Sequence, residues 1–124
     1  MKTILIVEDN EKNMKLARDI LRAKGYAVLE AVNGQDGVKL ALEHRPDLVL
    51  MDIQLPDING IEAFGRIRAD PVTARVPVVA FTASVTTGDR SRIGDAGFDA
   101  FLGKPIQLKD FLETVRRLAG EPGA

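Results

Sequence analysis

Each of five polar side chains follows a short apolar run in this sequence. Glu8 and Asp9 come after ILIV, and Asp52 comes after LVLM. Thr82 comes after VVAF, and Lys104 comes after FLG. Two carboxylates about 4 Å apart repel by roughly 4 kcal/mol at an effective dielectric of 20. If these acids meet in the folded chain, they must share a cation or bind protons.

The residue types favour a divalent cation and phosphate chemistry. Glu8, Asp9 and Asp52 offer hard oxygen ligands without His or Cys, which is the donor set that Mg²⁺ prefers. Once a metal ion and an ammonium neutralise its charge, a phosphoryl group can be attacked by a carboxylate, which gives an aspartyl phosphate. Lys104 can supply the ammonium for one phosphoryl oxygen, and the Thr82 hydroxyl can hydrogen-bond another.

The apolar runs alternate with segments of helical period, which is typical of βα units and predicts a parallel sheet. The predicted strands are 4–8, 27–31, 48–51, 78–81 and 100–102. The second run is mixed in polarity, which indicates an edge strand, whereas the first, third and fourth are continuously apolar. Right-handed βα units make a three-layer α/β sandwich. Ligands of such sheets bind at the carboxyl ends of the strands, so we expect the five polar residues to meet at one rim.

Five helices are predicted between and after these strands. The predicted ranges are 11–24, 35–43, 61–69, 87–96 and 107–119. The first helix has Asn10 as its N-cap and Gly25 as its stop. The fourth contains two glycines and few large apolar residues, so we expect it to be the least rigid. The inward stripe of the last helix is predicted to comprise Leu108, Phe111, Leu112, Val115 and Leu118.

Composition limits the classes of function. A chain of 124 residues with a formal net charge of -1 and 45% hydrophobic residues describes one soluble domain. The absence of cysteine fits a reducing cytoplasm and excludes a thiolate-ligated zinc site. Lys and Arg (17) nearly balance Asp and Glu (18) without a basic tract, so direct nucleic-acid binding is not expected. No apolar run reaches the roughly 20 residues of a membrane span, and acids occur too early for a signal sequence.

Four segments, in this order and spacing, resemble the receiver domain of two-component response regulators. They are ILIVEDN, LVLMDIQLPDING, PVVAFTA and FLGKP. The resemblance implies a flavodoxin-like (βα)5 fold with strand order 2-1-3-4-5 over residues 1–120, with 121–124 as a short tail. It also implies transfer of a phosphoryl group from a phosphohistidine to Asp52. The segments VEDNEKNMKLARDIL, LMDIQLPDINGIE and DFLETVRRL are most similar to stand-alone, single-domain receivers of the DivK type.

The resemblance also implies a metal site. Asp9 and the Asp52 carboxylate would ligate Mg²⁺ together with the backbone carbonyl of Gln54, and Mn²⁺ would be able to replace Mg²⁺. Glu8 would act mainly through a coordinated water. Gln54 and Ser84 flank the entry to the acyl phosphate, so both are expected to tune its lifetime.

A switch is the second implication of the resemblance. Thr82 and Phe101 would form the switch pair, in which the phosphoryl group draws the hydroxyl inward and the aromatic ring follows. The peptide bond between Lys104 and Pro105 would be cis. Many family members have Tyr where this chain has Phe101, which can rotate but cannot donate a hydroxyl to a partner.

The partners implied are those of a phosphorelay. A sensor histidine kinase or a histidine phosphotransfer protein would donate the phosphoryl group. A downstream effector or kinase would dock on the face built by the fourth helix, the fifth strand and the fifth helix, because no output domain is expected. The protein is expected to be a cytoplasmic monomer or weak dimer, without a membrane or nucleic-acid partner.

Plainer interpretations compete at each position. Glu8 and Asp9 could cap the first helix, and Thr82 could satisfy its own backbone. Lys104 could be a solvated loop lysine, and Phe101 is by default a core residue. All of these residues are expected at the same rim of the sheet, and this favours a phosphorylation site over the separate interpretations.

Other acids and the histidine are assigned no chemistry. Asp47, Asp57 and Asp99 lie at strand starts or in turns. His44 is interpreted as a surface residue at the end of the second helix.

Two other classes of function remain as alternatives. A phosphatase of the haloacid dehalogenase kind also uses an aspartyl nucleophile, but it needs a second acid where this chain has Gln54, and it needs a cap domain. A pseudo-receiver docking module would lack part of the acid set or the lysine. A dinucleotide-binding protein is disfavoured because no Gly-rich turn follows the first strand.

Overall fold

The computed structural model describes residues 2–82 and 96–122. Its five parallel strands form one sheet in the order β2-β1-β3-β4-β5, which confirms the predicted flavodoxin-like fold. The strands are β1 (Thr3–Val7), β2 (Ala27–Ala31), β3 (Leu48–Asp52), β4 (Val78–Thr82) and β5 (Ala100–Gly103). The helices are α1 (Glu11–Ala23), α2 (Gly34–His44), α3 (Gly60–Ala69) and α5 (Leu108–Ala119). The predicted fourth helix, 87–96, lies outside the described residues except for its last position.

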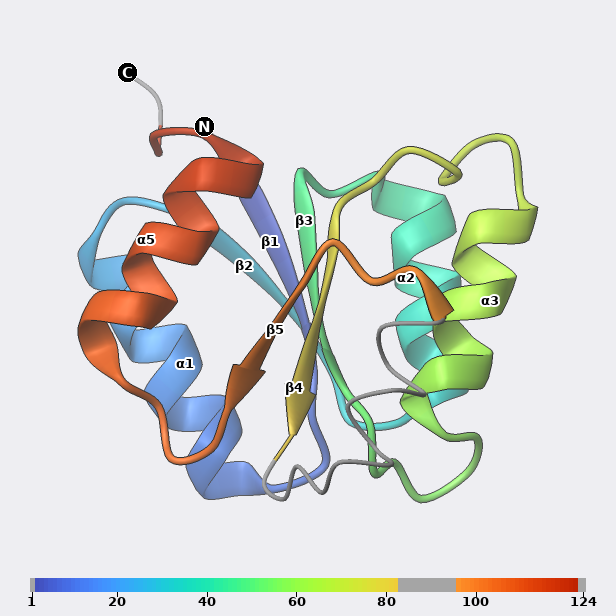
Figure 1. The fold of residues 1–124 in the computed structure, drawn as a ribbon, viewed down its shortest axis with the longest axis horizontal. Helices are drawn as coiled ribbons and strands as arrows, with labels where there is room; N and C mark the ends of the chain where they lie inside the picture. The colour runs from blue at the N-terminus through green and yellow to red at the C-terminus, as the bar shows by residue number, and fades with distance from the viewer. Residues whose placement is uncertain (1, 83–95, 123–124) are drawn as a thin grey trace.

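Helices cover both faces of the sheet, with α1 and α5 on one side and α2 and α3 on the other (Figure 1). Successive side chains of a strand point to opposite faces, so β1 supplies both cores. Ile4 and Ile6 pack in the core beneath α1 and α5, whereas Leu5 and Val7 pack in the core beneath α2 and α3. The sheet is therefore the middle layer of the predicted three-layer sandwich.

Strand burial follows strand position. Every residue of β3 and β4 is buried, as expected for central strands of a parallel sheet. Strand β2 lies at one edge and is mostly half-buried, which confirms the edge prediction. Strand β5 forms the other edge and alternates between half-buried and exposed residues.

Asparagine caps begin three of the helices. Each cap oxygen accepts a hydrogen bond from the backbone N–H three residues along, which satisfies a donor that has no partner within the helix. These bonds are Asn10 to Asn13 at 3.0 Å, Asn33 to Asp36 at 2.8 Å and Asn59 to Glu62 at 2.8 Å. Gly25, with φ 96°, follows the end of α1 as predicted. The helices thus begin and end where local sequence signals indicated.

Two details of the sequence predictions are wrong. The first strand ends at Val7 rather than at residue 8, whereas Asp52 and Thr82 are the last residues of their strands rather than the residues beyond them. Leu108 was expected on the inward stripe of the last helix, but its side chain is 55% exposed. Leu108 is the first residue of α5. Its position fits the helical period, but the buried residues of this helix begin only at Phe111.

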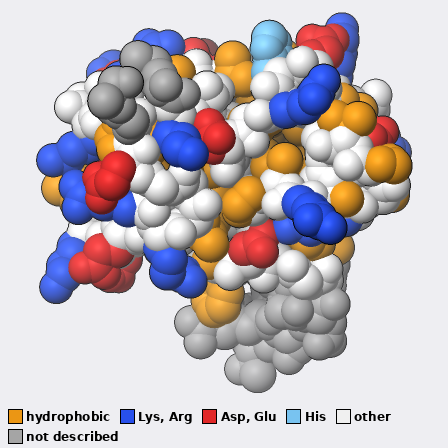
Figure 2. Space-filling model, turned by 90° about the horizontal axis from the view of Figure 1, so that it is seen from above, with side chains coloured by type: hydrophobic (Ala, Val, Ile, Leu, Met, Phe, Trp, Pro, Cys, Tyr) orange, Lys and Arg blue, Asp and Glu red, His pale blue; other side chains and the backbone are white. Residues whose placement is uncertain are grey.

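Charged groups of both signs are mixed on the surface. On the face seen from above, Lys and Arg side chains alternate with Asp and Glu rather than forming a basic tract (Figure 2). Among the helices within 2–82 and 96–122, none is long and apolar enough to cross a bilayer.

Candidate functional site

The five predicted site residues come from the carboxyl ends of four strands. Glu8 and Asp9 follow β1, Asp52 ends β3, and Thr82 ends β4. Lys104 follows β5, and its backbone N–H donates to the Thr82 carbonyl at 2.8 Å. Because β1 has β2 on one side and β3 on the other, the strand order reverses at this rim, where ligands bind in open α/β sheets.

The acid cluster is compact. One carboxylate oxygen from each of Glu8, Asp9 and Asp52 lies within 4.8 Å of the others. Glu8 and Asp52 are buried, each with 4% of its surface exposed, whereas Asp9 is exposed. The structure therefore brings together the three acids that the sequence selected, with one of them open to solvent.

Lys104 provides the positive charge inside the cluster. Its Nζ lies 2.5 Å from Glu8 Oε2 and 3.3 Å from Asp52 Oδ2. The same Nζ lies 5.2 Å from the centre of the Phe81 ring, a cation–π contact. The Lys104–Pro105 peptide bond is cis, in agreement with the prediction. The ammonium is therefore buried against the two buried carboxylates, so the solvated-lysine interpretation is wrong.

Burial raises the pKa of Asp52, and the nearby charge of Glu8 raises it further. The Lys104 ammonium and the Gln54 N–H lower the same pKa but do not offset the rise, so the pKa of Asp52 is about 7. A cation bound beside such a carboxylate would stabilise its ionised form and lower its pKa.

The loop after β3 contacts Asp52 at two points. The Gln54 backbone N–H donates to Asp52 Oδ1 at 3.0 Å, and the Gln54 side chain is exposed. Gly60 begins α3, and a Cβ built on it would lie 2.2 Å from the backbone oxygen of Asp52. The sequence indicated Asn59-Gly60 only as a helix start. That Gly60 also permits a backbone contact with Asp52 depends on the tertiary fold.

The two residues of the predicted switch differ in exposure. Thr82 is 4% exposed, whereas Phe101 is 43% exposed. Phe101 pairs with Ala80 in the β4–β5 register, and its neighbours Ala100 and Leu102 pack against the core beneath α5. Phe101 therefore faces away from α5, and the interpretation of Phe101 as a core residue is wrong. Ser84 lies outside the described residues.

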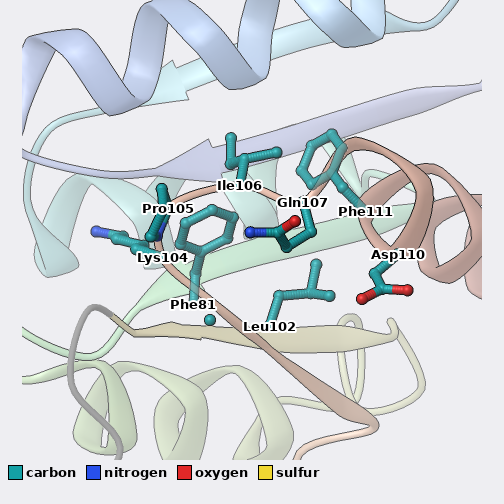
Figure 3. Close-up of a pocket in the computed structure, with 9 residues that line it drawn as sticks. Phe81, Leu102, Lys104, Pro105, Ile106, Gln107, Asp110 and Phe111 are labelled. Atoms are coloured by element: carbon teal, nitrogen blue, oxygen red, sulfur yellow. The ribbon is translucent and has the colours of Figure 1, made fainter.

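A cavity of about 190 Å³ lies beside the site, between β5 and the start of α5. Figure 3 shows the Phe81 ring in its wall and the Lys104 side chain directed away from Asp110. Apolar residues such as Leu102 and Phe111 line this cavity together with the polar Gln107 and Asp110. Lys104 and Phe81 both line this cavity, so it borders the site.

The acids that were assigned no chemistry have structural contacts instead. Asp47 accepts the Thr3 N–H at 2.7 Å, and Asp99 accepts the Val78 N–H at 2.8 Å. Asp57 accepts two backbone N–H groups at the start of α2. These contacts were missed because they join segments distant in sequence. His44 is exposed, as predicted.

The donor set fits Mg²⁺. Three carboxylates from Glu8, Asp9 and Asp52 are hard oxygen ligands, and one of them reaches solvent, where a magnesium ion keeps its waters. The chain has no cysteine, and its His44 is far along α2 from this rim, so a softer metal has no ligands here.

The fold and the site define a class of protein: an α/β sandwich with an acid cluster and a buried lysine where its strand order reverses. A family model described as the response regulator receiver domain matches residues 4–116. The chain therefore belongs to the response regulator receiver family. This membership confirms the resemblance drawn from the four motifs and favours a signalling switch over the phosphatase class considered above.

Relatives and solved structures agree with this assignment. The polar-differentiation response regulator DivK of Brucella anthropi is 45% identical over 97% of this chain and 98% of its own length. The receiver domain of a sensor histidine kinase from Pseudomonas aeruginosa, solved with magnesium in its active-site cleft, has a TM-score of 0.90 at 36% identity, covering 96% of this chain and 98% of that one. A CheY-like receiver from Methanospirillum hungatei has a TM-score of 0.88 at 27% identity, covering 98% and 96%.

Proposed function

We propose that Asp52 accepts a phosphoryl group and that the resulting aspartyl phosphate switches the partner binding of this domain. The observation that carries the proposal is the position of the Asp52 carboxylate, buried 3.3 Å from Lys104 Nζ and beside Glu8 and Asp9. A pseudo-receiver would lack part of this set, whereas this chain has all of it.

The phosphoryl donor is the phosphohistidine of a sensor histidine kinase or of a histidine phosphotransfer protein. An Asp52 carboxylate oxygen attacks phosphorus, a new O–P bond forms, and the P–N bond to the imidazole breaks. The leaving imidazole keeps the bonding electron pair and takes up a proton. Lys104, already buried against the carboxylate, is placed to hold a negative phosphoryl oxygen that would otherwise repel Asp52.

Magnesium completes the charge balance of the site, and Mn²⁺ is the expected substitute. It would be held by the carboxylates of Asp9 and Asp52 and by the backbone carbonyl of Gln54, with Glu8 acting through a water. When bound, the ion neutralises phosphoryl oxygens during transfer. Glu8 must then exchange part of its contact with Lys104, which lies 2.5 Å away, for contact with the water.

Thr82 and Phe101 carry the signal from the site to the surface. Thr82 ends β4 next to the site, and its neighbour in the β4–β5 register is Gly103, two residues from Phe101. Hydrogen bonding of the Thr82 hydroxyl to the phosphoryl group would let the half-exposed Phe101 ring turn inward. The surface formed by β5, α5 and the segment between β4 and β5 would then present a different shape to an effector or kinase.

The proposed setting is a cytoplasmic phosphorelay. Residues 1–120 act as the receiver, and a separate effector protein reads the phosphorylated state through the surface described above. The domain works as a monomer or a weak dimer and assists only its own phosphorylation and dephosphorylation. Nucleic acid is not a direct partner.

Substitution of the acceptor tests the proposal. Asp52→Asn should abolish acid-labile phosphate incorporation from a small phosphodonor with Mg²⁺, measured by mobility shift or phosphoprotein mass. Asp110→Asn removes an acid from α5 outside the cluster and should leave incorporation unchanged. Incorporation that persists in Asp52→Asn would show that another residue is the acceptor.

A further inference from the structure

The loop between β3 and α3 is bonded to a helix from another part of the chain. Asp57 lies in this loop, and its carboxylate accepts the Gly34 N–H through Oδ1 at 2.7 Å and the Gln35 N–H through Oδ2 at 2.9 Å. Gly34 and Gln35 are the first two residues of α2. The negative carboxylate also lies where the helix dipole favours an anion.

Helix α2 already has a cap of its own. Asn33 accepts the Asp36 N–H at 2.8 Å, so the third N–H of α2 has a partner within the helix start. Asp57 takes the two earlier N–H groups, which Asn33 does not reach. The contact therefore does more than begin a helix, because it joins that helix to the loop that follows Asp52.

Packing makes this junction tight. A Cβ built on Gly34 would lie 2.4 Å from the side chain of Ile58, so α2 and the loop are in direct contact at this point. At the far end of the loop, the Gly60 N–H donates to the Ile53 carbonyl at 2.9 Å. The loop is thus held at its base by Gly60 and at its tip by Asp57.

A short, stiff link joins Asp57 to the site. Only Leu55 and Pro56 separate Asp57 from Gln54. Pro56 has a nearly fixed φ, and the residue before a proline is restricted to extended conformations. Leu55 also packs against the core beneath α2 and α3. A displacement of Asp57 is therefore transmitted to Gln54 rather than absorbed between them.

The donors around Asp57 keep it ionised. Desolvation raises the pKa of its carboxyl, but the N–H groups of Gln35 and Gly34, together with that of Ile58 and its own, lower it below the usual value. The contact is accordingly a charge-assisted pair of hydrogen bonds, the stronger kind.

We propose that Asp57 is a positioning residue for the metal site: its carboxylate bonds to the start of α2 and thereby fixes the Gln54 carbonyl and the Gln54 N–H that orients Asp52. This inference rests on the proposed function of Asp52. It assigns a role to an acid that contributes no ligand and lies outside the acid cluster. The general reason is that groups holding a ligand in place affect metal affinity without touching the ion.

The test compares two caps of the same helix. Asp57→Ala should weaken Mg²⁺ binding by about tenfold, the lower end of the range seen when supporting contacts of metal ligands are removed. Asp57→Asn keeps one acceptor oxygen and should fall between that variant and the unaltered protein. Asn33→Ala removes the other cap of α2 but not the junction with the loop, so its Mg²⁺ affinity should stay within about twofold. Dissociation constants come from magnesium titrations followed by amide NMR shifts.

A second readout does not depend on the metal. Without Mg²⁺, amide hydrogen exchange at Gln54 should accelerate in Asp57→Ala and not in Asn33→Ala. Equal weakening of Mg²⁺ binding by both variants would overturn the proposal and leave Asp57 as an ordinary helix cap. Unchanged affinity and unchanged Gln54 exchange in Asp57→Ala would overturn it too. If the unaltered protein is neither labelled at Asp52 nor bound by Mg²⁺, the proposed function fails, and Gln54 exchange alone then decides the positioning role.

Discussion

At the scale of single residues, the site is a balance of buried charges. Two carboxylates, Glu8 and Asp52, share one ammonium from Lys104, while Asp9 remains in solvent. Burial raises the pKa of Asp52 most and the charge of Glu8 adds to the rise, so this pKa is about 7 although a lysine lies beside the carboxylate. The metal-free cluster should therefore bind an added cation.

Magnesium affinity should depend on pH through Asp52. Because its pKa is about 7, protons compete with the metal below that pH. Affinity should rise by up to about tenfold per pH unit as the pH increases toward 7 and level off above it. Titrations between pH 5.5 and 8.5, followed by amide shifts, measure this, and an affinity that is flat below pH 7 would contradict it.

The stability of the metal-free protein should show the opposite trend. The folded-state pKa of Asp52, about 7, exceeds the unfolded value near 3.8, so the fold favours the protonated form. The stability that this protonation contributes is fully present below about pH 4 and is lost as the pH rises through 7. Thermal unfolding across this range measures the trend. Asp52→Asn cannot titrate and should flatten it, whereas an identical slope in that variant would assign the effect to other groups.

At the scale of elements, the positions of helices and strands could be predicted because they depend on residues that are close together in the sequence. Caps such as Asn10 and the apolar periodicity of the strands placed the elements within a residue or two. Contacts between distant segments were not predictable in this way. The Asp57 bonds to α2 and the approach of Gly60 to Asp52 need the sheet to exist first. Leu108 was misplaced because helical period alone does not tell where the core ends.

The three strand-end acids were predictable for a different reason. Parallel strands bring their carboxyl ends to one rim, so the position of Glu8, Asp9 and Asp52 in the sequence was enough to predict their proximity. What the sequence could not provide is the charge pairing within the rim, because the reach of Lys104 to Glu8 depends on side-chain orientation.

Helix α3 offers a matched pair of glycines for testing the contact beneath Asp52. Gly60→Ala should destabilise the fold by about 2 kcal/mol or more, because its Cβ would lie 2.2 Å from the Asp52 carbonyl oxygen. Gly65 is in the same helix with nothing within 4 Å of its Cβ position, so Gly65→Ala should stabilise by about 0.5–1 kcal/mol. Chemical denaturation measures both changes. Equal effects at the two positions would show that the close approach at Gly60 relaxes freely.

At the scale of the whole molecule, the site and the proposed docking surface meet at one edge of the sheet. Strand β5 carries Phe101 on one face and ends next to Lys104, so the proposed phosphoryl contact and the proposed partner contact would both act on the same short strand. As the edge strand, β5 pairs with β4 alone, which leaves it freer to adjust than the central strands. Moving a two-state equilibrium from mostly inactive to mostly active requires about 5.5 kcal/mol of differential stabilisation.

The coupling between site and surface should fail when Thr82 loses its hydroxyl. Beryllium fluoride with Mg²⁺, which mimics a phosphoryl group, should shift the amide signals of Asp52, Lys104 and Phe101 in the unaltered protein. In Thr82→Ala the shifts at Asp52 and Lys104 should persist, because Lys104 reaches Asp52 directly at 3.3 Å, whereas the shift at Phe101 should largely disappear. Thr73→Ala removes a buried hydroxyl that bonds the Ile67 carbonyl away from the rim, so it controls for general loosening of the fold. A full Phe101 response in Thr82→Ala would mean that Lys104 and β5 transmit the signal without the hydroxyl.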